Sequence, residues 1–552
     1  MVFGDVVCGA DAPPDASVGV TIYYIDPTNP SAGAGTRANP YQSFASLPSV
    51  LSDGDVILGR SGTTIKESLL NTRFVANNLR LGVYGGSGKF TVDLFVTRAD
   101  WTYDSANDVW YRDYAASTGP VLEDGRPLVF VEWSSNIATT RQLMTPGSWA
   151  ANTSTHRLYI LPTVGVPGSH RIEVAEIDQC YHGTQDQRSG LTIEGWHFRG
   201  SKYTGFVIYN TLGLLIQDCD VDTCGGGWAG SYRTGNGFQI SHGCHDFVLR
   251  RIKAWDIFDS AISPQVYTTE QILSGGLIEH CEVVRSGLCG IETSLTLGDD
   301  GPCGLEDITI RRNVVRDSGR GWSGIRFGTG TGLSFLTNVH SADHWVRAMR
   351  VVDNKVYNCT GAAYRAYRCN SPVGVFSGND AADCQYGFWL TDNLVNVVGS
   401  NYLVTGNRVV RCGQGARVQG DTAGSMYSID NNTFAECPRA ISIEHTAGAA
   451  SVQNNIIVNC VQGVIHTGGG AVTKNNNTLD GNTTNYGGGL TQGTDALQDP
   501  KWQGDNYDRV GWDSPCRRAG VALGDRPAYV GSFARKTPSV GHREFGVGAI
   551  AR

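Results

Sequence analysis

Between Trp196 and Asn477 the chain repeats one short pattern of polar and apolar positions, at intervals of 22 to 41 residues. Each copy has a small polar residue, an apolar residue two positions later and, in most copies, a cysteine five positions after the first. A small residue follows three positions after the cysteine. The clearest copies start at Asn354, Asn379, Asn407, Asn432 and Asn455, with Cys359, Cys384, Cys412, Cys437 and Cys460. Repeats of this length are typical of solenoids, in which each repeat buries the apolar face of its neighbour. The long, flat side surface of such a solenoid suits an elongated polymer better than a small molecule.

Earlier copies are degenerate but keep the offset of five residues. They are Cys219 with Cys224, Ile252 with Ile257, Cys281 with Ser286, and Asn313 with Ser318. A short strand is expected after each small residue, with its first side chain inward and its second outward, because side chains alternate along a strand. The inward positions are then Phe238, Ala261, Ile291, Ile325, Ala363, Phe388, Ala416, Ile441 and Val464. The outward positions are Gln239, Ile262, Glu292, Arg326, Tyr364, Trp389, Arg417, Ser442 and Ile465.

Outside this repeat the pattern changes several times along the chain. A Gly/Pro-rich stretch from Thr21, with a short helix expected from Tyr41 to Leu51, predicts a cap over the first coil, whose end would otherwise be an open sheet edge. Aromatic residues and turn signals between 96 and 175 predict an antiparallel β insertion. The predicted organisation is an arm (1–20), a cap with the first coils (21–95), the insertion (96–175), the main solenoid (176–485) and a C-terminal capping segment (486–552).

Composition agrees with an all-β solenoid and excludes several functions. The 552 residues include 71 Gly and only 17% charged residues, which favours short strands and turns over long helices. A net charge of −8 provides no basic surface for nucleic acid, and the lack of a long apolar run argues against insertion into a membrane. The start, MVFGDVVCGADAPP, lacks the features of a secretion signal.

The 15 cysteines follow the repeat and form no CxxC pair. One cysteine per coil predicts an internal ladder of free thiols, since free cysteine behaves as a small buried apolar residue. The sequence therefore predicts neither a metal site nor a cofactor.

Three segments carry a resemblance to a known family. The YYIDPTNPSAGAGTRANPYQSF…DGDVIL stretch, the Asn-x-Val…Cys phrase and the terminal REFGVGAI resemble the right-handed parallel β-helix family, which includes pectate-lyase-like lyases, alginate epimerases and phage tailspike depolymerases. The resemblance implies a right-handed parallel β-helix, with an N-terminal cap and the insertion, that acts on a bacterial surface polysaccharide.

Within that family the chain looks most like a phage tailspike. The missing signal and the internal cysteines fit a protein made in a host cytoplasm and assembled into the virion tail. The resemblance implies a homotrimer, attached by the N-terminal arm or through a virion adaptor or baseplate protein. A bacterial lyase or epimerase, secreted to the cell exterior, is an alternative, and a non-catalytic receptor-binding spike is another.

Five successive outward residues predict a glycan-binding stripe. They are Glu292, Arg326, Tyr364, Trp389 and Arg417, and at ~4.8 Å per coil they would span roughly 20 Å. Aromatic rings stack on sugar rings, and arginine binds carboxylates or hydroxyls through two hydrogen bonds. A further outward column places Glu444, followed by His445, along the same surface.

Glycoside hydrolysis needs two carboxyl groups. Glu292 is the expected general acid because it begins the stripe on a regular strand. Its candidate partners are Asp259, on the preceding coil, and Asp299 or Asp300, in the loop that follows.

A β-elimination mechanism would use the stripe differently. Arg326 would neutralise the substrate carboxylate and Tyr364 would act as base or acid. His340 and His344, in a long loop, are a second source of a base, or would fold over bound polymer.

Overall fold

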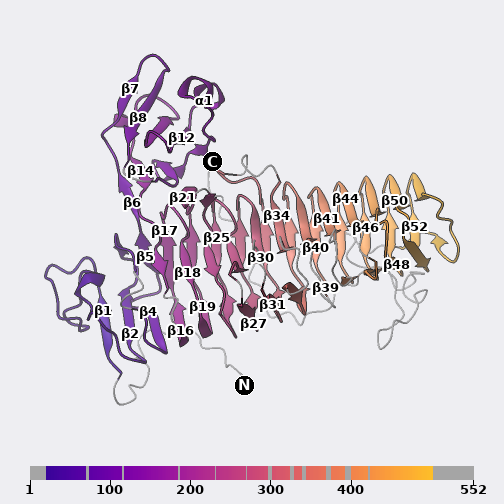
Figure 1. Ribbon diagram of the computed structural model, residues 1–552, viewed down its shortest axis with the longest axis horizontal. Coiled ribbons are helices and arrows are strands. Elements are labelled where there is room, and N and C mark those ends of the chain that lie inside the picture. The colour runs from indigo at the N-terminus through magenta and orange to yellow at the C-terminus, as the bar shows by residue number, and fades with distance from the viewer. Residues whose placement is uncertain are drawn as a thin grey trace.

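The computed structural model describes residues 20–501, apart from 70–73, 115–116, 184–186, 230–231, 269, 296–300, 324–328, 338–343, 368–373, 392–399 and 421–422. Most of this chain winds into three long parallel sheets, here called sheets A, B and C (Figure 1). Sheet A runs from β1 (Ile22–Ile25) to β51 (Ala471–Asn475), and sheet B from β3 (Thr64–Ile65) to β54 (Ala496–Leu497).

Sheet C positions the candidate site. Its strands are β15 (Tyr181–His182), β18 (Phe206–Ile208), β23 (Phe238–Ile240), β26 (Ile262–Val266), β30 (Cys289–Leu295), β34 (Thr331–Thr337), β38 (Ala362–Tyr367), β41 (Tyr386–Thr391), β44 (Gln414–Gln419), β47 (Arg439–Ile443), β50 (Gln462–His466) and β53 (Thr484–Gly487).

In the main part of the solenoid a coil contributes one strand to each sheet. In one coil β36 (Met349–Val352) lies in sheet A, β37 (Lys355–Tyr357) in sheet B and β38 in sheet C. The next coil places β39 (Gly374–Ser377), β40 (Asp380–Ala382) and β41 directly beside them, in parallel. The all-β solenoid expected from the repeat is confirmed.

The first polar position of the repeat forms an asparagine ladder inside the solenoid. Its members are completely buried: Asn313, Asn354, Asn379, Asn407, Asn432, Asn455 and Asn477. Each side-chain amide donates to the next asparagine and to a carbonyl of sheet A; Nδ2 of Asn407, for example, lies 2.9 Å from Oδ1 of Asn432 and 3.0 Å from the Phe376 carbonyl oxygen. The ladder ends at Asp495, whose charge is matched by Lys474 at 2.8 Å. A buried amide column is stable because every member has its partners.

The cysteine position of the repeat forms a second internal column. All twelve cysteines among the described residues are free and buried. The backbone N–H of Cys359 lies 3.4 Å from Sγ of Cys384 in the next coil. Serine occupies the same column in earlier coils, where the Ser286 and Ser318 hydroxyls lie 3.0 Å apart. The predicted ladder of free thiols is confirmed for these residues.

An aromatic cap closes the first coil. Phe44 is buried against Trp196, with ring centroids 6.0 Å apart, and against Phe90 at 6.1 Å. The helix expected from Tyr41 to Leu51 is only a short 3₁₀ turn, η1 (Phe44–Ser46). Ser43 caps this turn, and Glu67 accepts hydrogen bonds from the Ser43 hydroxyl and the Phe44 amide. These local bonds replace the longer helix.

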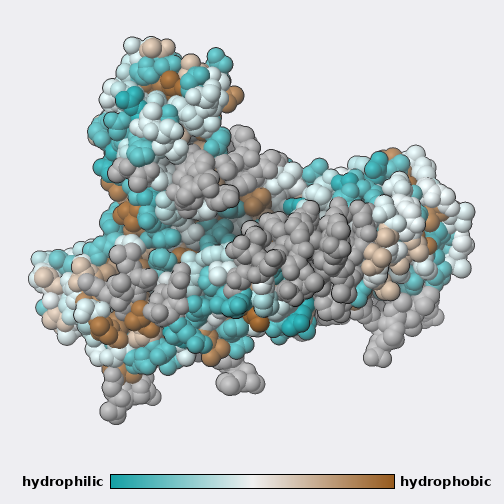
Figure 2. Space-filling model, in the orientation of Figure 1, coloured by the Kyte–Doolittle hydropathy of each residue, from teal (hydrophilic) through white to brown (hydrophobic). Residues whose placement is uncertain are grey.

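The insertion forms two small sheets that project from the N-terminal half of the solenoid (Figures 1 and 2). One sheet joins β6 (Phe95–Thr97), β9 (Val121–Glu123), β10 (Arg126–Pro127) and β14 (Ile172–Ala175). The other joins β7 (Thr102–Asp104), β8 (Val109–Asp113), β11 (Val129–Phe130), β12 (Ser148–Asn152) and β13 (Arg157–Leu161), beside helix α1 (Ile137–Leu143). Most of their pairings are antiparallel, as expected.

Among the residues that the structure describes, no helix has the length and apolar character needed to cross a bilayer.

Candidate active site on the outer face of sheet C

The strand register defines one continuous row on the outer face of sheet C. Glu292 pairs with Ser334, Ser334 with Arg365, Arg365 with Trp389, and Trp389 with Arg417. Each step moves one coil along the solenoid, a rise of ~4.8 Å. The row therefore runs parallel to the long axis, as a binding surface for a polymer would.

Two members of this row differ from the sequence prediction. A small residue near the start of each sheet C strand lies at a sharp bend, where a Cβ at Gly332, for example, would lie 2.7 Å from the Ala363 carbonyl oxygen. Ala363 is therefore itself the small residue of its coil, so Tyr364 points inward and Arg365 points outward. In the preceding coil the strand is β34, and its Ser334 takes the place assigned to Arg326, which lies outside the described residues.

The predicted register is also wrong by one residue in the coil of β26. Ile262, and not Ala261, pairs with Phe238 and Ile291 in the inward column, so Ser263 is the outward residue beside Glu292. The remaining inward positions lie as predicted and are completely buried: Phe238, Ile291, Phe388, Ala416, Ile441 and Val464. Ile325 lies outside the described residues, and Leu333 occupies the inward position of that coil.

Tyr364 belongs to the core and not to a binding surface. It is completely buried, and its ring stacks on that of Phe388 at 5.0 Å. Its hydroxyl lies 2.9 Å from the carbonyl oxygen of Asn354 and 2.8 Å from that of Asp380. The predicted role of Tyr364 in substrate binding, or as a base, is therefore wrong.

Replacing Tyr364 with phenylalanine should destabilise the protein by about 1–3 kcal/mol, because the carbonyls of Asn354 and Asp380 lose the single O–H donor that they share. Glycan affinity should not change, since the side chain does not reach the outer face. Urea unfolding and a glycan-binding titration on the same preparation measure both effects. A loss of affinity in a normally stable variant would contradict the inward placement.

Glu292 is a carboxyl group buried on the outer face. It is only 6% exposed, and its Oε2 accepts a hydrogen bond from Ser260 at 2.9 Å and one from Ser263 at 3.4 Å. Burial raises the pKa of Glu292, although the two serine hydroxyls and the charge of Arg365 oppose this shift. A carboxyl group that holds its proton above its usual pKa has the property required of a general acid.

One serine connects Glu292 with a second carboxylate. The hydroxyl of Ser260 lies 3.4 Å from Oδ1 of Asp259 and 2.9 Å from Oε2 of Glu292. The sum of these two distances is an upper limit for the separation of the two carboxyl oxygens. Asp259 is half-buried, so the structure brings it beside Glu292 as the sequence predicted. Asp299 and Asp300 lie outside the described residues.

Further along the row, a tryptophan is held between two arginines. The guanidinium carbon of Arg365 lies 4.5 Å from the centre of the Trp389 ring and 4.7 Å from that of Tyr367. Arg417 lies 5.8 Å from the same tryptophan ring, and Tyr386 packs against it at 5.1 Å. The indole Nε1 donates to Gln419 at 2.9 Å. These contacts fix the orientation of Trp389, which is half-buried.

Arg417 is bound to Glu444 through two nitrogens. Its NH2 lies 2.8 Å and its Nε 3.1 Å from Oε2 of Glu444. Burial alone would raise the pKa of Glu444, but hydrogen bonds from Arg417, Ser442 and Gln419 hold it below its usual value. Glu444 is therefore a charged anchor that positions Arg417.

His344 lies away from the row. The sequence placed it in a loop, but it belongs to strand β35 (His344–Arg347), where it pairs with Cys303 and is 2% exposed. Its proposed contact with bound polymer is therefore wrong. His340 lies outside the described residues.

The insertion packs against two residues of the solenoid near the candidate site, Phe258 and Trp322. Phe130 of β11 contacts Phe258 at 5.9 Å, and Trp149 of β12 contacts Trp322 at 6.1 Å. The Phe130 amide also donates to the Trp322 carbonyl at 3.0 Å. Since Phe258 directly precedes Asp259 in the chain, the insertion forms a wall on this side of the candidate site.

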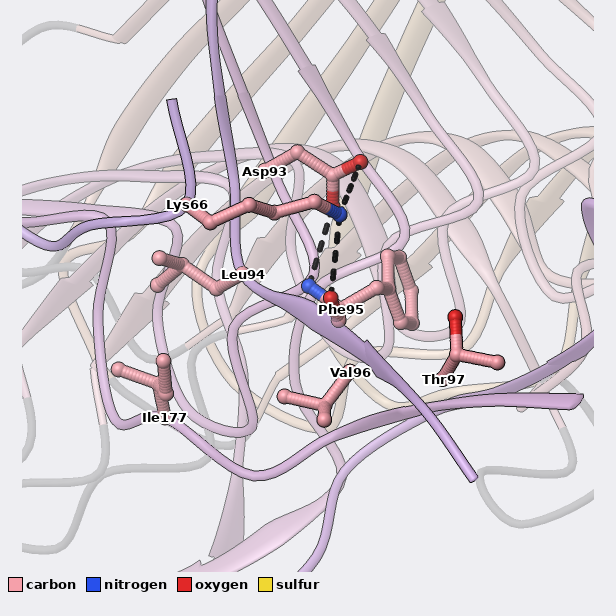
Figure 3. Close-up of a pocket in the computed structure, with 7 residues that line it drawn as sticks. All are labelled: Lys66, Asp93, Leu94, Phe95, Val96, Thr97 and Ile177. Carbon is pink, nitrogen blue, oxygen red and sulfur yellow. Dashed lines mark hydrogen bonds and ion pairs between the residues drawn. The ribbon is translucent and has the colours of Figure 1, made fainter. Parts of the chain in front are cut away.

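A separate pocket of about 270 Å³ lies at the root of the insertion (Figure 3). Lys66 contacts the Asp93 carboxylate at 3.0 Å and the Phe95 carbonyl at 3.1 Å, while the Phe95 amide donates to Asp93 at 3.0 Å. These bonds fix the corner at which the chain leaves the solenoid. No residue of sheet C lines this pocket, so we give it a structural role.

Within the described ranges, no group of three or more His, Cys, Asp and Glu side chains could hold a metal ion.

Sequence reasoning missed three residues of the site. Arg365 was hidden by the slip of one position, and Ser260 and Ser263 have no obvious signal beyond their place on the coil of Asp259. Ala362 and Ala363 are both small, so the sequence did not decide which of them precedes the inward residue of this coil.

The comparisons concern mainly the fold. A family model described as "Right handed beta helix region" matches residues 331–498, and no curated protein matches. Similar solved structures include XylC in complex with xylose (TM-score 0.49, 12% identity, 87% of each chain) and a glycoside hydrolase (TM-score 0.47, 10% identity, 85% of this chain and 96% of the other). The receptor-binding domain of the siphovirus 9NA tailspike is also similar (TM-score 0.31, 11% identity, 90% of this chain and 74% of the other). The strand topology and the family match together identify this chain as a right-handed parallel β-helix.

Proposed function

We propose that this protein binds a bacterial surface polysaccharide along the outer face of sheet C and cleaves it by glycoside hydrolysis, with Glu292 as general acid. The observation that carries the proposal is the pair formed by Glu292 and Asp259 through Ser260. Glu292 is buried with a raised pKa, whereas Asp259 is more exposed. Two carboxyl groups in unlike environments are the arrangement that separates an acid from a nucleophile or base.

The short distance between the two carboxyl groups favours a retaining reaction. Their nearest oxygens lie closer than the ~6.5–9.5 Å typical of inverting enzymes. In the first step the Asp259 carboxylate attacks the anomeric carbon, and the departing oxygen takes the proton of Glu292. In the second step water breaks the glycosyl ester, and Glu292 takes the proton of that water.

The row beyond Glu292 would hold the polymer. The exposed part of the Trp389 ring, between the two guanidinium groups, offers an apolar contact for a sugar ring, and Arg365 offers guanidinium donors for hydroxyls or carboxylates. Both side chains are fixed by their neighbours, so little conformational entropy is lost when a glycan binds.

The elimination mechanism has less support. It required Tyr364 as base or acid, and that side chain lies in the core. Of the two other candidate bases, His344 is buried in β35 and His340 lies outside the described residues. The product assay described below distinguishes hydrolysis from the two alternatives, which are a lyase or epimerase and a non-catalytic receptor-binding spike.

We further propose that the protein is a phage tailspike. Support comes from the free, buried cysteines, which suit folding in a reducing host cytoplasm. The proposal includes a homotrimer located in the virion tail and joined to it through an adaptor or baseplate protein.

The test is an analysis of products from a panel of purified capsular and O-antigen polysaccharides. New reducing ends without a new unsaturated uronate would support hydrolysis, and proton NMR of the first products would show retention. Unsaturated products would instead establish elimination. Binding without any product would establish an adhesin.

Replacing Trp389 with alanine should weaken polysaccharide binding by about 1–3 kcal/mol, the usual contribution of an aromatic stacking surface. Trp255→Ala is the matched control, because Trp255 is a half-buried tryptophan on the outer face of sheet B, in β25 (Lys253–Trp255). Calorimetric titration of both variants with the polysaccharide measures the two affinities. Equal affinities in the two variants would place the binding surface elsewhere.

A further inference from the structure

Four rings from successive coils form a cluster at one edge of sheet C. They are His182, Tyr209, His242 and Tyr267, and each stands at or just after the end of its strand. Tyr209 lies 6.0 Å from His182 and 5.3 Å from His242, and His242 lies 4.9 Å from Tyr267, measured between ring centres. The cluster therefore runs parallel to the solenoid axis over the coils that precede Glu292.

The register connects this cluster with Glu292. Ser263, Gln265 and Tyr267 occupy alternate positions of one strand and the residue after it, so all three face outward. The amide of Gln265 donates to Ser263 at 2.7 Å, and Ser263 contacts Glu292 at 3.4 Å. Tyr267 is thus on the same face as Glu292, roughly 7 Å along the strand from Gln265.

The rings are arranged to receive a ligand. Tyr267 is 38% exposed, whereas Tyr209 and His242 beneath it are almost fully buried. Both supporting rings lie at 85° to the Tyr267 ring, which fixes its orientation. Nδ1 of His242 is buried and has no hydrogen-bond partner among the described residues.

The cluster is uncharged near neutral pH. Burial lowers the pKa of His182 and of His242, so both imidazoles stay neutral. Burial raises the pKa of Tyr209, which keeps its hydroxyl protonated. Neutral rings with hydroxyl and imidazole edges match an uncharged sugar, which presents apolar faces and hydroxyl groups. The guanidinium groups of Arg365 and Arg417 lie on the other side of Glu292.

We infer that the cluster of His182, Tyr209, His242 and Tyr267 is a second sugar-binding site, specific for an uncharged sugar ring. Because this site and the Arg365–Trp389 row lie on opposite sides of Glu292, the polymer passes the catalytic carboxyl in both directions. The protein therefore cleaves within chains and not from their ends. This inference rests on the proposed function for the cleavage, but not for the binding.

The test uses Tyr267→Ala, with Tyr103→Ala as control, since Tyr103 is an exposed tyrosine (47%) on the insertion. Binding is measured in the Glu292→Gln background on a microarray of capsular polysaccharides, O-antigens, dextran, xylan, alginate and polygalacturonate. Tyr267→Ala should lose roughly five- to fiftyfold in affinity for the polysaccharide that the parent binds. Tyr103→Ala should not change it.

The cleavage mode is measured separately, with Glu292 intact. Size-exclusion chromatography should show a rapid fall in polymer length before short oligosaccharides appear. If no probe is cleaved but Tyr267→Ala loses binding, the sugar site stands and the catalytic proposal falls. Unchanged affinity in Tyr267→Ala, an equal loss in Tyr103→Ala, or release of short products from the start would overturn the inference.

Discussion

The Glu292→Gln variant should bind polysaccharide as tightly as the wild type and cleave it at least about 100-fold more slowly, the lower end of what a positioned general acid contributes. Glutamine has nearly the same shape, and its carbonyl oxygen can still accept the hydrogen bond from Ser260. What the variant loses is the proton that the leaving oxygen needs. Initial rates of reducing-end formation and a parallel binding titration measure the two effects.

Glu282→Gln is the matched control, because Glu282 is an exposed glutamate on the outer face of sheet B, in β29 (Glu282–Val284). It should keep full activity. In the wild type the rate should fall as pH rises through the raised pKa of Glu292, since only the protonated form donates. Wild-type turnover in Glu292→Gln would remove Glu292 from the mechanism.

The fold could be predicted from the sequence because its physical cause repeats. In the later coils an asparagine, an apolar residue, a cysteine and a small residue stand at fixed offsets, and each has a separate task in the solenoid. Asn379 continues the amide ladder, Cys384 fills the second column, and Gly387 permits the bend into sheet C, where a Cβ would lie 2.4 Å from the Gly415 carbonyl oxygen. Each of these side chains contacts the next coil, so the repeat in the sequence reports the contacts between coils.

The outer row was harder to predict because a slip of one residue moves a side chain to the opposite face. Ala362 and Ala363 both satisfy the requirement for a small residue, and only the pairing of Tyr364 with Phe388 decides between them. The result exchanges a tyrosine for Arg365 on the binding face. In the coil of Trp389 a single glycine, Gly387, precedes the inward Phe388, and the placement of Trp389 and of its partner Arg417 was correct.

The ring cluster had no repeating signal at all. His182, Tyr209, His242 and Tyr267 end strands of different length, and the turns that follow them share no pattern. The link from Asp259 through Ser260 to Glu292 was equally invisible, because it joins two coils through a serine hydroxyl. Such features depend on which coils become neighbours, and on the exact register, and not on local propensity.

Removing one side chain of the asparagine ladder should cause a large loss of stability. Asn407→Ala leaves the Asn379 backbone N–H, which lies 2.9 Å from Oδ1 of Asn407, without an acceptor, and deprives the Phe376 carbonyl of its amide donor. Each buried polar group left without a partner costs about 1–3 kcal/mol, so the variant should be less stable by roughly 3–5 kcal/mol. The midpoint of urea unfolding and the rate of proteolysis report the loss.

Asn401→Ala is the control for this variant, since Asn401 is exposed on β42 (Asn401–Thr405) of sheet A, close to Asn407 in the chain. It should leave the unfolding midpoint nearly unchanged. Because each coil contacts only its neighbours, the damage in Asn407→Ala should remain local, with faster hydrogen exchange near Asn379 and Asn432 and little change near Glu292. Uniformly faster exchange along the solenoid, or a midpoint equal to that of Asn401→Ala, would mean that the ladder does not hold the coils together.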